Sequence, residues 1–579
     1  MSKGPMEQGV WQRWLLLLVG IQLASSQCPE QCQCVRSAQV ECFGADITTV
    51  PSPIPANAMT LQIINTRIAE LGDAAFGNAS LLIGLRVEKN ILSRISPRAF
   101  QNLPDLRYLS LASNKLQELP VQVFEPLNKL ESLLLSSNQI LQVEPSHFTH
   151  LSNLKELQLH GNNLEELQEG VFDQLTSLTK LNLARNNIDR LPPRAFERLA
   201  RLQVLRLYEN RLRHIPVGTF DGLPELQELG LHQNQLETLS PELFVHNTNL
   251  QKLYLSNNLL TTLPSGVFLP LHALAKITLH VNRLRDISPS AFGPMPNLQE
   301  LWLYDNELST LPTAVFSNLT QLHLLVLSKN RLRSVAPGAF QGLGELQELS
   351  LHSNALRRLD ARALEGLPKL QNISLHHNQL QALPRGLFGA TPGLRHLQLH
   401  SNALEYLPAG IFSPLTALRE VRLHNNSWRC DKGILPLQGW LEENPHKVGE
   451  IPPLCAQPPA LQGTPIARLP KDQFLDPQPP TATPHPNTLL PDDTSEAASP
   501  DDASMEPPTG LPASPQEEEE EKEEERGQWG LTRLQSGVVV AVIVLVCVAL
   551  LAALVALVVY GCRKKSHVVL MRMKAPNEA

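Results

Sequence analysis

The sequence predicts an α/β-type solenoid, in which short coils stack side by side and share one parallel β-sheet on a concave face. The first observation is a ladder of asparagines: in steps of 24 residues back from Asn426, every position is Asn as far as Asn90, fifteen in a row. The second is a column ten residues after each ladder position, which is Phe at fourteen of fifteen places from Phe76 to Phe412, with Leu364 the exception. An uninterrupted period of this length predicts a one-dimensional stack.

Each coil also follows a fixed frame, L-x-x-L-x-L-x-x-N, as in Leu298, Leu301, Leu303 and Asn306. The alternation in L-x-L turns both leucines inward and the middle residue to solvent, which predicts a short strand. One further step of 24 before Asn90 reaches Thr66, so we expect sixteen coils over residues 58–426. The frame and period are those of leucine-rich repeats, which form a horseshoe with a concave parallel sheet.

The ladder has a physical reason. The chain turns sharply after each strand, and buried backbone groups in that turn have no sheet partner. An asparagine amide both donates and accepts, so a column of asparagines satisfies these groups from coil to coil. The Phe column fills the convex side. At ~4.8 Å between strands, sixteen coils form a concave arc of roughly 75 Å, a size that suits a protein or an extended polymer.

Both ends of the sequence indicate a type I protein of the plasma membrane with its repeats outside the cell. Residues 1–26 read as a secretory signal, with an apolar run that begins at Trp14. Residues 537–560 carry no charge, and as a helix they are ~36 Å long, enough to cross a bilayer. Basic residues from Arg563 onwards place the short tail, 561–579, in the cytoplasm. Small residues in the span allow lateral homo-association.

The segment before this span, residues 477–536, is a predicted stalk. It is rich in Pro, Ser and Thr and then in acidic residues, a composition that buries no core and holds the repeats away from the membrane. The chain carries a net charge of −7, and most of the acidic excess lies in this stalk. The repeats are therefore close to neutral, which argues against nucleic acid as a partner.

Cysteines flank the repeats on both sides. Two groups frame the array, the first being Cys28, Cys32, Cys34 and Cys42, and the second Cys430 and Cys455. In a secreted chain these groups predict disulfide-stapled caps, over residues 27–57 and 427–476. A zinc site in the first group is disfavoured because paired C-x-x-C knuckles are missing. Cys562 lies at the cytoplasmic edge of the span, where acylation and an unmodified thiol both remain open.

The cap sequences resemble those of extracellular leucine-rich repeat proteins, the family of platelet glycoprotein V. For the first cap the resemblance implies the disulfides Cys28–Cys34 and Cys32–Cys42. The second cap is similar to the family pattern at Trp428, Cys430, Asp431, Leu437, Trp440 and Leu441. Lys432 stands where the family has a cysteine, so the resemblance implies a single bridge, Cys430–Cys455, and a looser cap.

The resemblance also implies a function. It points to a cell-surface glycoprotein that contacts matrix proteins such as collagen, fibronectin or laminin and modulates cell adhesion and migration. The alternative is a regulatory co-receptor or decoy for a soluble ligand or another membrane receptor. An enzyme is not expected, because the sequence lacks G-x-S-x-G, H-E-x-x-H and phosphate-loop motifs. No cofactor is expected.

Aromatic residues concentrate at positions expected on the concave face: Tyr108, Tyr208, Tyr254, Trp302 and Tyr304. Exposed Tyr and Trp are favoured anchors of protein interfaces. The other interpretation is that solvent-facing sheet positions simply favour aromatic residues. We favour an interface centred on Tyr254, Trp302 and Tyr304.

The position two before the ladder is histidine in seven coils: His160, His232, His280, His352, His376, His400 and His424. His377 and His396 lie near the last four. Stacked histidines repel one another when protonated, which suggests pH-dependent binding, and they are able to hold a divalent metal. We favour the plainer interpretation, that repeat duplication copied a tolerated polar residue, and we assign no metal site.

Four N-glycosylation sequons occur, at Asn78, Asn318, Asn372 and Asn425. Asn78 and Asn318 are expected near the convex Phe column, where a glycan does no harm. Asn372 is expected on the concave sheet, where a glycan would block part of the binding face.

Overall fold

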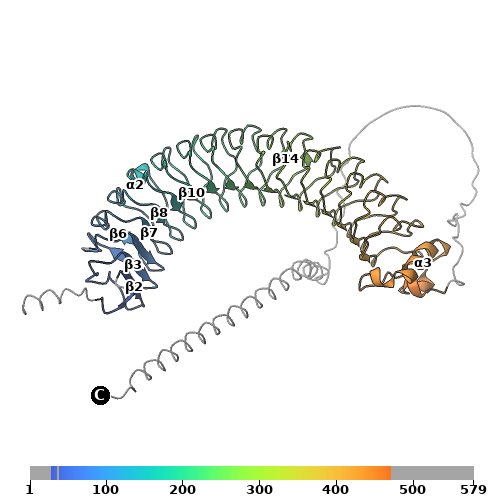
Figure 1. The fold of residues 1–579 in the computed structure, drawn as a ribbon, viewed down its shortest axis with the longest axis horizontal. Helices are drawn as coiled ribbons and strands as arrows, with labels where there is room; N and C mark the ends of the chain where they lie inside the picture. The colour runs from blue at the N-terminus through green and yellow to red at the C-terminus, as the bar shows by residue number, and fades with distance from the viewer. Residues whose placement is uncertain (1–27, 36–37, 78, 471–579) are drawn as a thin grey trace, which may run out of the picture. The chain divides into compact units, whose positions relative to one another are not determined.

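A computed structural model describes residues 28–35, 38–77 and 79–470 (Figure 1). The expected signal segment, stalk, membrane-spanning helix and cytoplasmic tail lie outside these residues, as does the sequon at Asn78. Within the described part of the chain, no helix combines the length and apolar character that crossing a membrane requires.

One continuous sheet of eighteen strands runs through the repeats. β1 pairs antiparallel with β2, and every later neighbour pairs in parallel. The strands are β1 (Cys32–Val35), β2 (Gln39–Phe43), β3 (Thr60–Ile64), β5 (Gly84–Glu88), β7 (Tyr108–Ser110), β8 (Ser132–Leu134), β9 (Glu156–Gln158), β10 (Lys180–Asn182), β11 (Val204–Arg206), β12 (Glu228–Gly230), β13 (Lys252–Tyr254), β15 (Lys276–Thr278), β17 (Glu300–Trp302), β18 (Leu324–Val326), β19 (Glu348–Ser350), β20 (Asn372–Ser374), β21 (His396–Gln398) and β22 (Glu420–Arg422).

The register of this sheet follows the 24-residue period. Leu301 pairs with Ile277 on one side and with Leu325 on the other, each 24 residues away. The expected parallel sheet is therefore confirmed, and its strands line the inner curve of the stack (Figure 1). Two short parallel pairs lie outside this sheet, β4 (Glu70–Leu71) with β6 (Arg94–Ile95) and β14 (Thr262–Leu263) with β16 (Asp286–Ile287).

The Phe column is buried on the opposite side of each coil, as the sequence predicts. Neighbouring rings that contact each other lie further apart than the strands do: Phe268 and Phe292 are 5.8 Å apart between centroids, and Phe220 and Phe244 are 6.3 Å apart. Strands repeat every ~4.8 Å. Because the outer layer has the longer repeat, each coil tilts against the next and the stack curves around its sheet.

The ladder asparagines act as the sequence predicts. Nδ2 of Asn306 donates to the carbonyl oxygen of Leu303 in its own coil and to that of Leu279 in the preceding coil, both at 3.1 Å. Its Oδ1 accepts the backbone N–H of Leu284 at 3.1 Å. One amide thus closes the turn of its own coil and ties that coil to its neighbour.

The turn before each ladder position has a left-handed backbone, a conformation that the sequence pattern does not predict. The residue preceding the ladder has positive φ throughout, as at Val281 (54°), Asp305 (56°) and His377 (49°). Side chains of ordinary residues are strained in this region, and a β-branched one most of all. Its use at every coil indicates that the turn requires this conformation.

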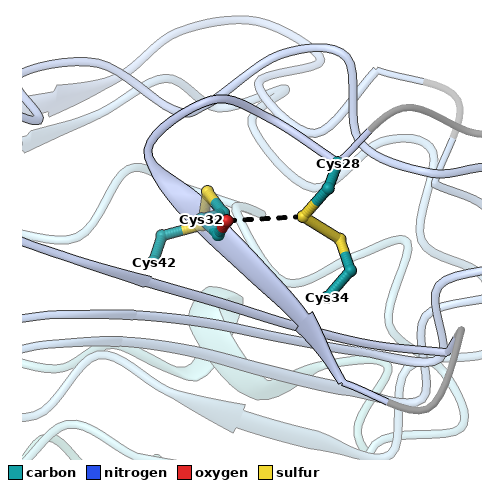
Figure 2. The surroundings of a disulfide bond; sticks show 4 residues. All are labelled: Cys28, Cys32, Cys34 and Cys42. Carbon is teal, nitrogen blue, oxygen red and sulfur yellow. Dashed lines mark hydrogen bonds between the residues drawn. A yellow bond between two sulfur atoms is a disulfide. The ribbon is translucent and has the colours of Figure 1, made fainter.

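Disulfides close both caps. The Cys32–Cys42 bond staples β1 to β2 at directly opposite positions of the register, and the Cys28–Cys34 bond ties the residues before β1 to that strand (Figure 2). Sγ of Cys28 also lies 3.5 Å from the carbonyl oxygen of Cys32 (Figure 2). A disulfide sulfur has no hydrogen to donate, so we interpret this approach as a packing contact.

The second cap contains the Cys430–Cys455 disulfide. Trp428 is fully buried there, and its Nε1 donates to the carbonyl oxygen of Leu423 at 2.9 Å, which ties the cap to the last coil. The helices within the described residues are short: α2 (Pro145–Phe148) in the repeats, and η1 (Lys432–Ile434), α3 (Leu435–Glu443), η2 (Pro445–Lys447), η3 (Pro459–Leu461) and η4 (Ile466–Arg468) in this cap.

Candidate functional site

Two groups of rings lie on the solvent side of the sheet. In the first, the imidazole of His232 stacks on Tyr208 with centroids 4.4 Å apart and meets Tyr254 edge-on at 5.9 Å. Tyr208 and His232 follow the strands of successive coils, and Tyr254 ends β13. His232 therefore joins two tyrosines that the sequence places 46 residues apart.

The second group lies two coils further along. Here His280 stacks on Tyr304 at 4.5 Å between centroids, and Trp302 meets Tyr304 edge-on at 6.1 Å. Nε1 of Trp302 donates to Oε2 of Glu300 at 3.1 Å, which fixes the indole on the sheet. We call the two groups together the aromatic patch: Tyr208, His232, Tyr254, His280, Trp302 and Tyr304.

Small residues separate the two groups. Ser256 and Thr278 are buried between them, and Thr278 Oγ1 donates to Ser256 Oγ at 3.4 Å. The tyrosine and tryptophan side chains of the patch are all partly exposed. Tyr108 stands apart on β7, four coils earlier, where the guanidinium of Arg86 lies 5.8 Å from its ring centroid. The sequence-expected aromatics thus form one patch plus one isolated residue.

The last four histidines of the column form a continuous stack. His352, His376, His400 and His424 lie with successive centroids 4.4, 4.5 and 4.5 Å apart, in planes inclined by 18° or less. Burial lowers the pKa of His352 to about 4 and that of His400 to about 3, and the neighbouring charges add to the effect. The rings are therefore neutral near pH 7, and the expected repulsion between protonated rings favours this neutral form.

His377 and His396 flank this stack in different ways. His377 is exposed and meets His376 and His400 edge-on, at 5.3 and 5.8 Å. Potential ligand nitrogens of these three histidines all lie within 4.8 Å of one another. His396 instead uses Nδ1 to contact Oδ1 of Asn372 at 2.8 Å. The sequence predicts that these histidines lie near each other. It does not predict that three of them converge.

The described sequons lie on different surfaces. Asn372 begins β20 and is half-buried on the sheet, where it contacts His396. Asn318 and Asn425 are exposed, and Asn318 Nδ2 donates to the carbonyl oxygen of Phe292 in the convex Phe column at 3.4 Å. A glycan on Asn372 would therefore stand on the concave face.

Several known proteins are similar to parts of this chain. Human leucine-rich repeat-containing protein 15 is 56% identical over 88 residues, 14% of this chain and 15% of that protein. Human reticulon-4 receptor-like 2 is 34% identical over 102 residues, covering 17% and 24% of the two chains. Trophoblast glycoprotein of Macaca fascicularis is 32% identical over 94 residues, covering 16% and 22%. The aligned stretches thus span at most 24% of these relatives' length.

Solved structures share the fold. Drosophila Toll in its complex with Spatzle is 24% identical with a TM-score of 0.59, covering 75% of this chain and 68% of that chain. A leucine-rich repeat protein of Leptospira interrogans is 29% identical with a TM-score of 0.51, covering 66% and 88%. The plant peptide hormone receptor RGFR1, in complex with RGF2, is 24% identical with a TM-score of 0.52, covering 66% and 61%.

The family model for the leucine-rich repeat matches over most of the array. The matched segments are 56–116, 128–188, 176–236, 224–284, 273–332, 320–380 and 368–427. Together they cover more than half of the sequence, and each contains the strand and ladder described above. With its shared parallel sheet and its stapled caps, the chain belongs to the leucine-rich repeat family.

Proposed function

We propose that this protein is a type I cell-surface glycoprotein that binds an extracellular matrix protein, of the collagen, fibronectin or laminin type, through its concave face. Binding would modulate cell adhesion and migration. The observation that carries the proposal is the aromatic patch, which spans five successive coils on the solvent side of a rigid sheet. The disulfide caps support an extracellular setting, since such bonds persist in oxidising compartments.

The surroundings of the patch also suit a protein ligand. Ion pairs lie beside the rings, Arg206 with Glu228 at 2.9 Å and Lys276 with Glu300 at 3.4 Å. Protein interfaces commonly have aromatic anchors at the centre and a polar rim. Rings held by stacking and by the Trp302–Glu300 hydrogen bond lose little side-chain entropy on binding, which favours affinity.

Full-length protein on the cell surface offers the direct test. Cells expressing the wild type and a Trp302→Ala, Tyr304→Ala double variant would be plated on collagen, fibronectin, laminin and uncoated surfaces. We expect the double variant to lose at least ten-fold in binding to the matrix protein that the wild type recognises, since truncation of one hot-spot side chain costs about 2 kcal/mol or more.

Tyr108→Ala is the matched control, because Tyr108 is a partly exposed aromatic on the same sheet outside the patch. Surface expression and thermal unfolding verify folding for each variant. The proposal fails if the wild type adheres no better than untransfected cells, or if both variants lose binding equally. Capture of a soluble ligand or of another receptor, without adhesion to matrix, would favour the co-receptor alternative.

A further inference from the structure

We propose that His376, His377 and His400 form a binding site for a divalent transition metal such as Zn²⁺, with one coordination position open to an extracellular ligand. Their potential ligand nitrogens all lie within 4.8 Å of one another. The site lies five coils beyond the centre of the aromatic patch. Metal binding there does not depend on whether that patch binds a matrix protein.

The fold itself brings the three rings together. His376 and His400 occupy the same column position in successive coils, so their planes are nearly parallel, inclined by 9°. The lone pairs of two parallel rings lie in parallel planes, which alone do not surround an ion. His377 supplies a different direction, since its ring stands at 75° to His376 and 84° to His400.

The orientation of His377 follows from the left-handed turn. Its φ is 49°, the conformation that this position adopts in every coil, and its backbone N–H donates to the carbonyl oxygen of His400 at 3.3 Å. This hydrogen bond holds the residue beside the next coil. The left-handed turn thus places the ring of His377 across the stacked rings of His376 and His400. The other coils lack histidine at this position.

The distances fit a metal after a small contraction. Zinc binds imidazole nitrogen at about 2.0–2.1 Å, which places tetrahedral ligand atoms roughly 3.4 Å apart. The separations are at most 4.8 Å, so they must close by no more than about 1.4 Å on loading. His377 is exposed and able to rotate about its side-chain bonds, whereas the buried His400 holds its place.

Charge also permits binding. Burial lowers the pKa of His376 and of His400, so both rings are neutral and retain a lone pair at extracellular pH. Nδ1 of His376 is buried and finds no hydrogen-bond partner within residues 28–470. The guanidinium of Arg422 opposes a cation here, but its ion pair with Glu420 at 2.9 Å reduces that repulsion. We therefore expect moderate affinity.

The ligand chemistry selects the metal. Imidazole suits zinc, copper and nickel, whereas calcium and magnesium prefer oxygen ligands. Three protein ligands leave a fourth tetrahedral position for water or for a carboxylate or imidazole of a partner. Metal binding would therefore give this end of the concave face a specific contact that the rings alone do not supply.

Metal titration of the full-length protein, purified in detergent without a histidine tag and stripped with chelator, tests the site. Zn²⁺ would be titrated by calorimetry, and Co²⁺ by its visible absorption. We expect one Zn²⁺ site per chain and no heat of binding on titration with Ca²⁺. In His377→Asn we expect the affinity for Zn²⁺ to be at least ten-fold weaker. Asn is chosen because it tolerates the left-handed backbone, so the turn is preserved.

His396→Asn is the matched control, since His396 lies on the same face in the next coil but outside the trio. Thermal unfolding in chelator verifies that both variants fold. The proposal is overturned if the wild type binds no Zn²⁺, if His377→Asn binds as tightly as the wild type, or if His396→Asn weakens binding as much as His377→Asn does.

Discussion

The imidazole of His280 lies parallel to the phenol ring of Tyr304, with centroids 4.5 Å apart and planes inclined by 7°. The two residues are 24 positions apart and occupy the same place in successive coils. Stacking at this distance shields the imidazole from water, and burial lowers its pKa from 6.5 to about 4. The ring column thus couples the stability of the repeats to pH.

The direction of this coupling follows from linkage. Between pH 6.5 and pH 4 the unfolded chain binds a proton at His280 that the folded chain excludes, so stability decreases as the pH falls through this window. Above pH 6.5 both states are neutral and the effect vanishes. A whole proton corresponds to about 1.4 kcal/mol per pH unit, and partial exposure of this ring reduces that slope.

His280→Tyr isolates this contribution, because the column already carries tyrosine at Tyr304 and Tyr208. We expect the unfolding temperature of the wild type to drop more between pH 7.4 and pH 5.0 than that of the variant, as measured by differential scanning calorimetry. His446→Tyr, at an exposed residue of the second cap, serves as control. Equal drops in the wild type and His280→Tyr would contradict the expectation.

Removal of a ladder amide should weaken the stack at one place. Asn306→Ala leaves the carbonyl groups of Leu303 and Leu279 and the N–H of Leu284 without this partner. The two carbonyl groups each keep a second amide donor, Asn330 for Leu303 and Asn282 for Leu279, so it is the N–H of Leu284 that is left unsatisfied. A buried polar group left unsatisfied costs about 1–3 kcal/mol, so we expect a loss of about 1–3 kcal/mol in the free energy of unfolding.

Hydrogen exchange of the amides of coils around Asn306 would locate this loss, since a solenoid is able to open locally. Asn163→Ala is the control, because Asn163 is exposed, and a surface change of this kind typically alters stability by less than about 0.5 kcal/mol. If Asn306→Ala and Asn163→Ala were equally stable in urea, the ladder would not have the role described here.

Glycan position offers a separate test of the binding face. Asn318 is exposed and contacts the convex Phe column, whereas Asn372 is half-buried on β20 and held by His396. We expect peptide mapping of the protein from mammalian cells to find the glycan at Asn318 and little at Asn372. Full occupancy of Asn372 would mean that ligands contact the concave face elsewhere than at β20.

The sequence predicts most of this fold because a fixed period also fixes the register. Once Leu301 and Asn306 are placed in one coil, the strand, turn and ladder of every other coil follow from steps of 24 residues. The column of histidines is predicted in the same way, since like positions in successive coils become neighbours. The histidine rings stack because the repeat of the sheet places each one beside the next.

Features that depend on turn conformation are not predicted in this way. The convergence of His377 on His376 requires a left-handed φ, and the residues at that position share no type from which such a conformation is recognised. The link between Tyr208 and Tyr254 through His232 similarly depends on ring rotamers. The period determines which residues are neighbours, while side-chain directions come from local backbone geometry.

The left-handed turn itself leads to a stability prediction at Val281, whose φ is 54°. A β-branched side chain is strained there, and a left-handed backbone costs an ordinary residue roughly 1–2 kcal/mol. Asn257 occupies the equivalent position one coil earlier with a φ of 55°. We therefore expect Val281→Asn to raise the free energy of unfolding by about 1 kcal/mol, measured by urea denaturation.

The converse substitution is Gly161→Val, at the same position of another coil with a φ of 70°. A Cβ at Gly161 would meet only ordinary contacts, the nearest being Ser137 at 3.5 Å, so the first side-chain atom introduces no steric clash. We expect it to lower stability by about 1–2 kcal/mol. If Val281→Asn destabilised the protein while Gly161→Val left it unchanged, the turn would not require the left-handed conformation, and the placement of His377 beside His376 and His400 would lose its physical cause.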